Sequence, residues 1–310
     1  MLPGWTREPA TLRRLALASV VANVVIVVTG GAVRLTGSGL GCPTWPSCTE
    51  NSLTPTRQYA LHGLIEFTNR QLTFVLVVVV LATLAAALLA RRERGLAVLL
   101  AASIPAQAVL GGITVLTKLN PWTVAAHFLL SMAIIAVAFV LWWRLRSAVA
   151  AVPAARPGRG LVPAGWLLVG LTGAVLAVGT VVTGSGPHAG DKGATHRIHL
   201  APGSVSQLHA DLVMLLIGVT VGFVLLAGGR LRRVAGWLLG IELAQGVVGY
   251  VQYFSHVPAP LVGVHMLGAC LVWLAALAVL ASLDVSPFRA RTVAASTPTA
   301  VPRRNPVSAG

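Results

Sequence analysis

Charged residues are scarce in this chain. Only 10% of its 310 residues are Asp, Glu, Lys or Arg, and 8 of them are acidic, whereas a soluble domain carries about 25% charged residues. Hydrophobic residues make up 56% of the sequence. This composition excludes an ordinary soluble domain and predicts that the lipid bilayer surrounds most of the chain.

Cysteine is scarce too, and the three cysteines exclude a disulfide-rich scaffold. The shortage of acidic residues leaves a net charge of +15, which in a soluble protein would favour a nucleic-acid partner. Here the basic residues cluster between apolar runs and form no stripe interleaved with aromatic residues. We therefore expect no nucleic-acid partner.

Long apolar runs dominate what is present. About 20 apolar residues are needed to cross a hydrocarbon core of roughly 30 Å, and the chain holds eight such runs. They predict an all-α membrane protein whose eight transmembrane helices form two pseudo-symmetric four-helix bundles. The first run is too long for a signal peptide, and it has a counterpart in the second half. The runs are 14–34, 62–90, 96–117, 121–143, 161–183, 206–229, 234–254 and 260–283.

Basic residues set the expected orientation. With eight spans, nearly all arginines fall on one face, which the positive-inside rule makes cytoplasmic. We therefore expect a multi-pass protein of the plasma membrane with both termini in the cytoplasm. The arginines of that face include Arg13, Arg14, Arg91, Arg92, Arg94, Arg144, Arg146, Arg230, Arg232 and Arg233, and the opposite loops hold Arg57, Lys118, Lys192 and Arg197.

Internal repeats divide the chain into two halves. Two copies of Thr-Gly-Ser-Gly, Thr36–Gly39 and Thr183–Gly186, are 147 residues apart, and two pairs of histidines and a pair of glutamines recur at similar offsets. This predicts an N-terminal half (1–146), a linker (147–160), a C-terminal half (161–283) and a disordered tail (284–310). The pairs are His62 and His209, 147 residues apart, and His127 and His265, and Gln107 and Gln245, both 138 apart.

The four histidines lie near the outer ends of the even-numbered runs. One such histidine could be an interfacial side chain bonded to a carbonyl, but four at equivalent depths favour a functional role. Imidazole is the commonest metal ligand in proteins, and no cysteine or carboxylate lies at zinc-ligand spacing. Two histidines on facing helices suit the axial ligation of haem iron. We therefore expect one haem in each half.

Glu66 is the one carboxylate within the predicted helices of the first half. It lies four residues after His62 and four before Arg70, so the three side chains share a helix face. Two interpretations remain open: a buried ion pair with Arg70 that holds the helix, or a carboxylate that handles a proton or stabilises a cation beside a haem. The position matching Glu66 in the second half is Val213, which suggests that one site reacts and the other transfers electrons or is structural.

The two long Gly/Pro-rich outer loops, 35–61 and 184–205, are better candidates for caps than for simple connectors. Cys42 and Cys48 lie in the first, where an oxidising outer face favours a disulfide or redox pair; a free pair or a metal site is the alternative. His188, in the second loop, is a candidate supporting residue. We expect Gln107 and Gln245 to bond across helices, Cys270 to be an inert core residue, and Glu242 to be a buried polar partner.

Several of these stretches resemble the haem A synthase family. Residues 30–39 with the cysteine loop resemble its first outer loop, 65–70 its second helix and 120–127 its fourth. In the second half, 183–191, 207–209 and 262–265 complete a resemblance that covers roughly residues 15–283. It implies an oxidoreductase that converts the C8 methyl of haem O to the formyl of haem A by two successive hydroxylations. It further implies the substrate haem in the first half and haem b in the second.

The resemblance carries over to individual residues. Glu66 matches the catalytic candidate of the family, supported by Arg70. Many members have Glu-x-x-His in helix 2, where this chain has Asn69 in the histidine position. Either His62, two turns earlier on the same face, replaces that axial ligand, or His127 alone holds the substrate haem. His209 and His265 are the expected ligands of haem b.

The expected partners are a haem O synthase that delivers the substrate, a membrane electron acceptor or donor such as a quinone, and the bilayer itself. The sequence leaves the oligomeric state open, including a homo-oligomer. A di-haem b-type electron-transfer cytochrome is the alternative function, because its fold and ligands would be the same. A transporter fits less well, since no pair of helices is broken by Pro or Gly at mid-membrane.

Overall fold

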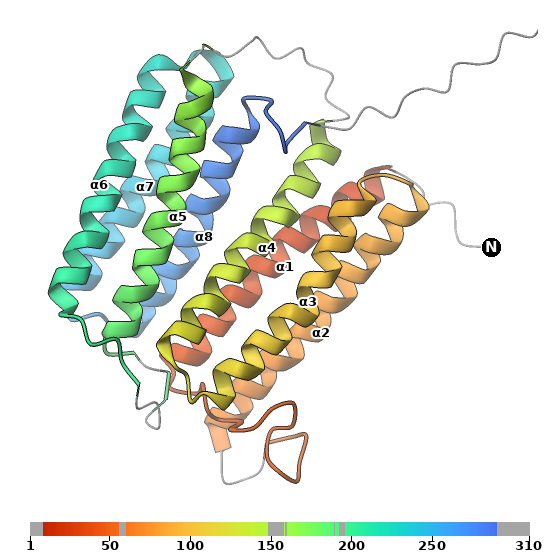
Figure 1. The fold of residues 1–310 in the computed structure, drawn as a ribbon, viewed down its shortest axis with the longest axis vertical. Coiled ribbons are helices and arrows are strands. Elements are labelled where there is room, and N and C mark those ends of the chain that lie inside the picture. The colour runs from red at the N-terminus through yellow and green to blue at the C-terminus, as the bar shows by residue number, and fades with distance from the viewer. Residues whose placement is uncertain are drawn as a thin grey trace, which may run out of the picture.

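The computed structural model describes residues 9–55, 60–147, 158, 160–188, 190–191 and 196–289. Within these residues it contains eight α-helices and no strand beyond an isolated bridge (Figure 1). Each helix is long and apolar enough to cross a membrane, which confirms the predicted all-α class. The helices are α1 (Pro9–Leu35), α2 (Ala60–Leu89), α3 (Arg94–Leu116), α4 (Pro121–Ser147), α5 (Leu161–Ser185), α6 (Pro202–Leu226), α7 (Gly229–Phe254) and α8 (Ala259–Ala281).

The helices are longer than the apolar runs at the end where the arginines gather, which we call the arginine end. Arg13 and Arg14 lie inside α1, Arg144 and Arg146 in the last turn of α4, and Arg230 in the first turn of α7. From the sequence, we expected Arg13 and Arg14 before the first helix and the other three between helices. The helical hydrogen bonds continue past the apolar run because long arginine side chains can carry their charge away from it.

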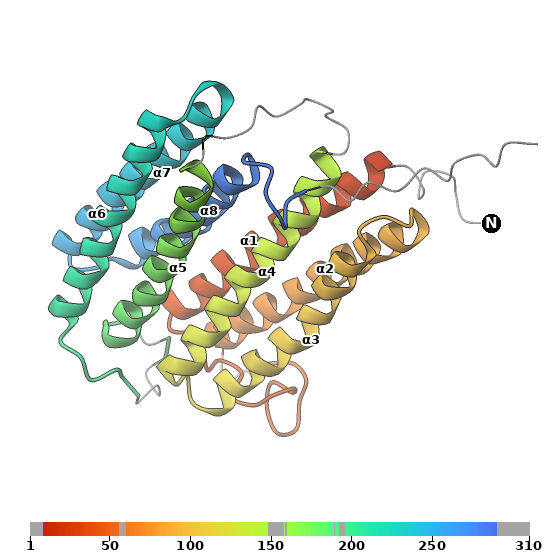
Figure 2. The ribbon, with the colours of Figure 1, turned by 45° about the horizontal axis from the view of Figure 1, so that its top comes forward.

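The helices form two four-membered rings that stand side by side (Figures 1 and 2). In the first ring α1 contacts α2, α2 contacts α3, α3 contacts α4 and α4 contacts α1. The second ring repeats this order with α5 to α8. It follows that α2 faces α4, and α6 faces α8, across the diagonal of a ring. The rings meet through α1 and α4 on one side and α5 and α8 on the other.

The contact between the rings is apolar and close. Cys270 of α8 is fully buried in it, as expected for an inert core residue. The Trp273 indole donates a hydrogen bond of 2.9 Å to the carbonyl of Met132 in α4. Gly31 of α1 lies directly against the side chain of Met266 of α8. The absence of a side chain at Gly31 therefore sets how closely α1 and α8 approach.

Parts of the predicted linker and tail lie outside the described residues, namely 148–157, 159 and 290–310. The beginning of the tail is described and is packed. Phe288 is only 3% exposed, and its ring lies 6.3 Å from that of Phe139 in α4. Packed structure is therefore present beyond the boundary expected at 283, because an aromatic side chain is buried there.

A bulky side chain at Gly31 should loosen the contact between the rings. We expect Gly31→Leu to lower the melting temperature in detergent, at a cost of about 1–3 kcal/mol for overpacking. Gly218→Leu is the matched control, because a Cβ at Gly218 would meet nothing within 4 Å. Equal melting temperatures of the two variants in a thermal unfolding assay would contradict this account of the contact.

Candidate functional site

His209 of α6 and His265 of α8 point into the interior of the second ring from its two diagonal corners. Their ring centroids are 6.4 Å apart, with 60° between the ring planes. Each imidazole lies beside a glycine of a neighbouring helix: a Cβ at Gly179 would be 3.2 Å from Cε1 of His209, and one at Gly249 would be 3.4 Å from Cε1 of His265. The glycines leave room for the imidazoles, and the packing of the helices brings the two imidazoles together.

The Nδ1 atoms of His209 and His265 are buried and form no hydrogen bond within the described residues, although the backbone of Val175 lies near His209. A buried polar atom without a partner costs about 1–3 kcal/mol. Two imidazoles that converge on one apolar interior fit the two axial positions of a haem iron. The donor set therefore suits a haem.

In the first ring, His127 of α4 has the same arrangement that His265 has in the second ring. A Cβ at Gly111 would be 3.1 Å from Cε1 of His127, and the Nδ1 atom of this histidine is again buried and unpaired. In both rings a glutamine amide donates to the backbone carbonyl of the histidine, over 2.8 Å from Gln107 and over 2.6 Å from Gln245. The expected bonding of both glutamines across helices is confirmed.

His62 lies in a different setting. It is an exposed residue in the first turn of α2, and its Nδ1 is hydrogen-bonded to the Ser38 hydroxyl over 2.9 Å. No ring contact between His62 and His127 occurs among the described residues. The structure therefore ties His62 to the outer loop and does not bring it to His127.

Asn69 of α2 has a setting in the first ring that resembles the setting of His209 in the second. Asn69 is nine residues into α2 and His209 seven into α6. Asn69 lies against α1, where a Cβ at Gly30 would be 3.9 Å from its Nδ2, as His209 lies against α5. Its Oδ1 is also buried and unpaired. His209 is 140 residues after Asn69 and the Thr-Gly-Ser-Gly copies are 147 apart, so the first outer loop is the longer one.

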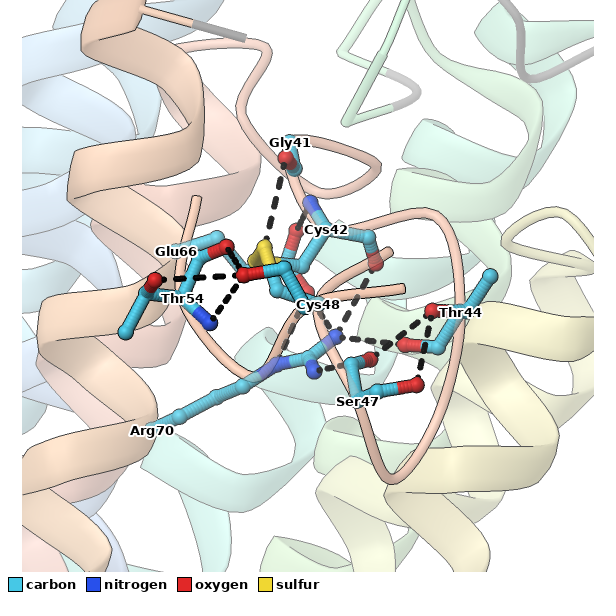
Figure 3. The surroundings of a disulfide bond; sticks show 9 residues. Gly41, Cys42, Thr44, Ser47, Cys48, Thr54, Glu66 and Arg70 are labelled. Atoms are coloured by element: carbon cyan, nitrogen blue, oxygen red, sulfur yellow. Dashed lines mark hydrogen bonds and ion pairs between the residues drawn. A yellow bond between two sulfur atoms is a disulfide. The ribbon is translucent and has the colours of Figure 1, made fainter. Parts of the chain in front are cut away.

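Glu66 is buried at 6% exposure, and both of its oxygens accept hydrogen bonds. The backbone N–H of Cys42 donates to Oε2 over 2.7 Å, and Arg70 donates to Oε1 over 2.6 Å (Figure 3). The Arg70 guanidinium also donates to the carbonyls of Cys42, Thr44 and Ser47, over 3.0, 3.2 and 3.3 Å. The ion pair expected between Glu66 and Arg70 is present, and it also holds the outer loop.

That loop covers the histidine end of the first ring. Cys42 and Cys48 are joined in a disulfide and are both buried (Figure 3). Trp45 packs onto α3, where a Cβ at Gly112 would be 2.5 Å from the indole. Since the preceding residue, Gly111, faces His127, the loop reaches from Glu66 on α2 to the helix beside the histidine.

The second outer loop links the two rings. Arg34 of α1 donates to the carbonyl of His188 over 2.8 Å, and the His188 Nε2 is bonded to the carbonyl of Val257 over the same distance. Gly39 donates to the carbonyl of Gly190, also over 2.8 Å. His188 therefore connects α1 of the first ring with the loop between α7 and α8 of the second, and its Nε2 is engaged in that second bond.

Comparison with known proteins identifies the family of this chain. Residues 13–190, more than half of the chain, match the family model COX15-CtaA, described as cytochrome oxidase assembly protein. The chain belongs to the haem A synthase family. It is 29% identical over 309 residues to a protoheme IX farnesyltransferase of Thermus thermophilus, covering 88% of this chain and 48% of that protein. The chain thus spans about half the length of this relative.

Two haem A synthases from Geobacillus match parts of the chain. That of Geobacillus thermodenitrificans is 28% identical over 133 residues, which is 41% of either chain. That of Geobacillus kaustophilus is 28% identical over 148 residues, which is 45% of either chain. These matches place the chain with haem A synthases through part of its length only.

Sequence reasoning missed several residues of this family member's site. The glycines beside the imidazoles were overlooked, although Gly111 and Gly249 share the 138-residue offset of His127 and His265. Trp45 gave no periodic signal, because its position over α3 depends on how the loop folds. Glu242 was expected to be a buried polar partner, and it is bonded to the Thr220 hydroxyl over 2.9 Å.

The disulfide can be tested directly. We expect alkylation without reductant to leave Cys42 and Cys48 unlabelled, because both sulfur atoms are bonded, and a reductant to expose them. Cys270 serves as the internal control, since its burial should protect it until the protein is denatured. Mass analysis that found label on both loop cysteines of the folded, unreduced protein would contradict the structure.

Proposed function

We propose that this protein is a haem A synthase that oxidises the C8 methyl of haem O to the formyl of haem A by two successive hydroxylations. The observation that carries the proposal is an asymmetry between two similar rings. Both have a histidine and a glutamine-bonded carbonyl at the same depth, but only the first has a buried carboxylate under a disulfide-linked loop. The haem A synthase name of two relatives supports it.

In this proposal the rings hold different haems. His209 and His265 hold haem b in the second ring, and His127 holds haem O in the first. When bound, a haem supplies a redox-active iron. The second ring has no acid at the position of Glu66. When Asn69 is aligned with His209, the residue of α6 that corresponds to Glu66 is Ser206. The second haem therefore serves electron transfer.

Glu66 is the proposed catalytic residue. In a site of low dielectric constant, its fixed negative charge stabilises positive charge that develops at the methyl carbon. It can also take a proton from an attacking water. Arg70 and the N–H of Cys42 hold the carboxylate at one place, so we assign positioning roles to Arg70 and the loop.

The proposed reaction also predicts where the protein lies and which partners it has. We propose that the chain lies in the plasma membrane with cytoplasmic termini, that a haem O synthase delivers the substrate, and that a quinone or similar carrier accepts electrons. The match to a protoheme IX farnesyltransferase supports a link to the step that attaches the farnesyl group. A di-haem electron carrier, the alternative, would need neither Glu66 nor the covering loop.

Ligation in the second ring is tested by removing either imidazole. We expect His209→Ala and His265→Ala each to abolish the low-spin absorption of haem b while the haem of the first ring remains, because each variant leaves one axial position empty. Optical spectra and haem counts per chain measure this. A full low-spin spectrum in both variants would show that the pairing is wrong.

The role of Glu66 is tested by Glu66→Gln, which keeps the size and one acceptor oxygen but removes the charge. We expect the variant to fold and bind haem, yet to form haem A about 10²–10⁴-fold more slowly, the usual effect of losing a general base. Accumulated haem O, or its singly hydroxylated product, would be seen by extraction and mass analysis.

Arg70→Gln is the matched control for the structural role of this ion pair. It removes the donors to the carbonyls of Cys42, Thr44 and Ser47 and the donor to Oε1 of Glu66, but it keeps the carboxyl group and its bond from the Cys42 N–H. If Glu66 only held the loop, both variants would lose haem A formation equally. Normal haem A formation per folded Glu66→Gln molecule would exclude a catalytic Glu66 and favour the electron carrier.

A further inference from the structure

The two rings differ at one diagonal corner near the histidine end. The corner on α4 or α8 is the same in both, with His127 or His265, a facing glycine and a glutamine bonded to the histidine carbonyl. The opposite corner carries His209 on α6 but Asn69 on α2. Since α2 faces α4 as α6 faces α8, Asn69 lies across the ring from His127.

Asn69 cannot replace the missing imidazole. The residues that ligate haem iron in proteins are His, Cys, Met and Tyr, and a neutral carboxamide is a weak ligand for iron. Its Oδ1 is buried with no hydrogen-bond partner, and its Nδ2 lies beside Gly30. An unpaired amide at this place provides a hydrogen-bonding group without an iron ligand.

His62 does not fill the position either. It precedes Asn69 by two helical turns, which is about 10.5 Å along the axis of α2. Its side chain is exposed and its Nδ1 is bonded to Ser38. To reach the interior, His62 would have to give up this bond and pass Glu66, which the loop holds in place.

We infer that the haem of the first ring has one axial ligand from the protein, His127, and that its opposite axial position, beside Asn69, is open to a small neutral diatomic ligand. This rests on the proposed haem in the first ring. Glu66 lies three residues before Asn69 and so on the same face of α2. The open position is therefore next to the one buried acid of the first ring and beneath the disulfide loop.

Carbon monoxide is the probe for the open position, because it binds reduced haem iron only where an axial site is free. The purified full chain is loaded to two haems, reduced and titrated with carbon monoxide. We expect one haem to be high-spin and to bind carbon monoxide, and the other to be low-spin and inert. A wild-type protein that holds only low-spin, inert haem would overturn the inference.

Reciprocal substitutions give the matched test. Asn69→His should supply the second imidazole, turn the first haem low-spin and lower its affinity for carbon monoxide at least about tenfold, one decade being 1.4 kcal/mol. His209→Asn should do the reverse in the second ring and add a carbon monoxide-binding haem. Asn69→Leu, which cannot ligate iron, should keep one high-spin haem that binds carbon monoxide. Unchanged carbon monoxide binding in both Asn69→His and His209→Asn would refute the assignment.

His62→Ala separates the remaining alternative. We expect its spectrum and carbon monoxide binding to match the wild type. If the first haem is low-spin in the wild type and becomes high-spin in His62→Ala, then His62 is the ligand and the inference is wrong. Haem A formation is measured separately. Carbon monoxide binding without haem A formation would refute the proposed function alone. Haem A formation with a first haem that does not bind carbon monoxide would refute the inference alone.

Discussion

A helix bundle of this composition depends on one constraint: lipid offers no hydrogen bonds, so every buried polar atom has to be satisfied from within. The chain meets this demand with helices for the backbone and with short bonds such as Ser19 to Thr83 for side chains. The exceptions among the described residues are few, and most of them belong to the interiors that hold the histidines. They are Asn69 Oδ1, Gln107 Oε1, His127 Nδ1, His209 Nδ1, Glu242 Oε2, Gln252 Oε1 and His265 Nδ1. Such a concentration of unpaired atoms is expected where a group binds from outside the chain.

The two rings share the residues of one diagonal corner and differ at the other. The combination of glutamine, glycine and histidine on α3 with α4 recurs on α7 with α8 at the same spacing and with the same hydrogen bond. The corner on α2 differs from its counterpart on α6: it has Asn69 in a setting like that of His209, and it carries Glu66 and Arg70. Similar scaffolds with unlike corners can bind related cofactors while doing different chemistry. A reactive site needs an accessible position, and an electron carrier needs a closed one.

The contacts of Glu66 with the outer loop are compatible with both interpretations that the sequence left open for this residue. Its carboxylate is held by Arg70, as a structural ion pair would be, and the same pair binds the backbone of the disulfide loop. A fixed carboxylate is what electrostatic stabilisation requires, because a charge already in place needs no reorganisation during the reaction. Structural and catalytic roles therefore do not compete at this residue. The loop that holds Glu66 also carries Trp45 onto α3 and so covers the same ring.

The sequence by itself determined the eight helices, the shared end of the histidines, the duplication and the family. These features depend on apolar length, charge distribution and local spacing, which are properties of short stretches of chain. Only the tertiary structure decided which side chain of α2 has a setting like that of His209. The 147-residue offset aligned His62 with His209, but the first outer loop is longer than the second, and it is Asn69 that packs on α1 as His209 packs on α5. The loop partners of the Glu66–Arg70 pair were hidden for the same reason. Cys42, whose N–H donates to Glu66, and Thr44 and Ser47, whose carbonyls accept from Arg70, belong to a loop without periodicity. Their positions follow from contacts between residues far apart in sequence, which no local pattern records.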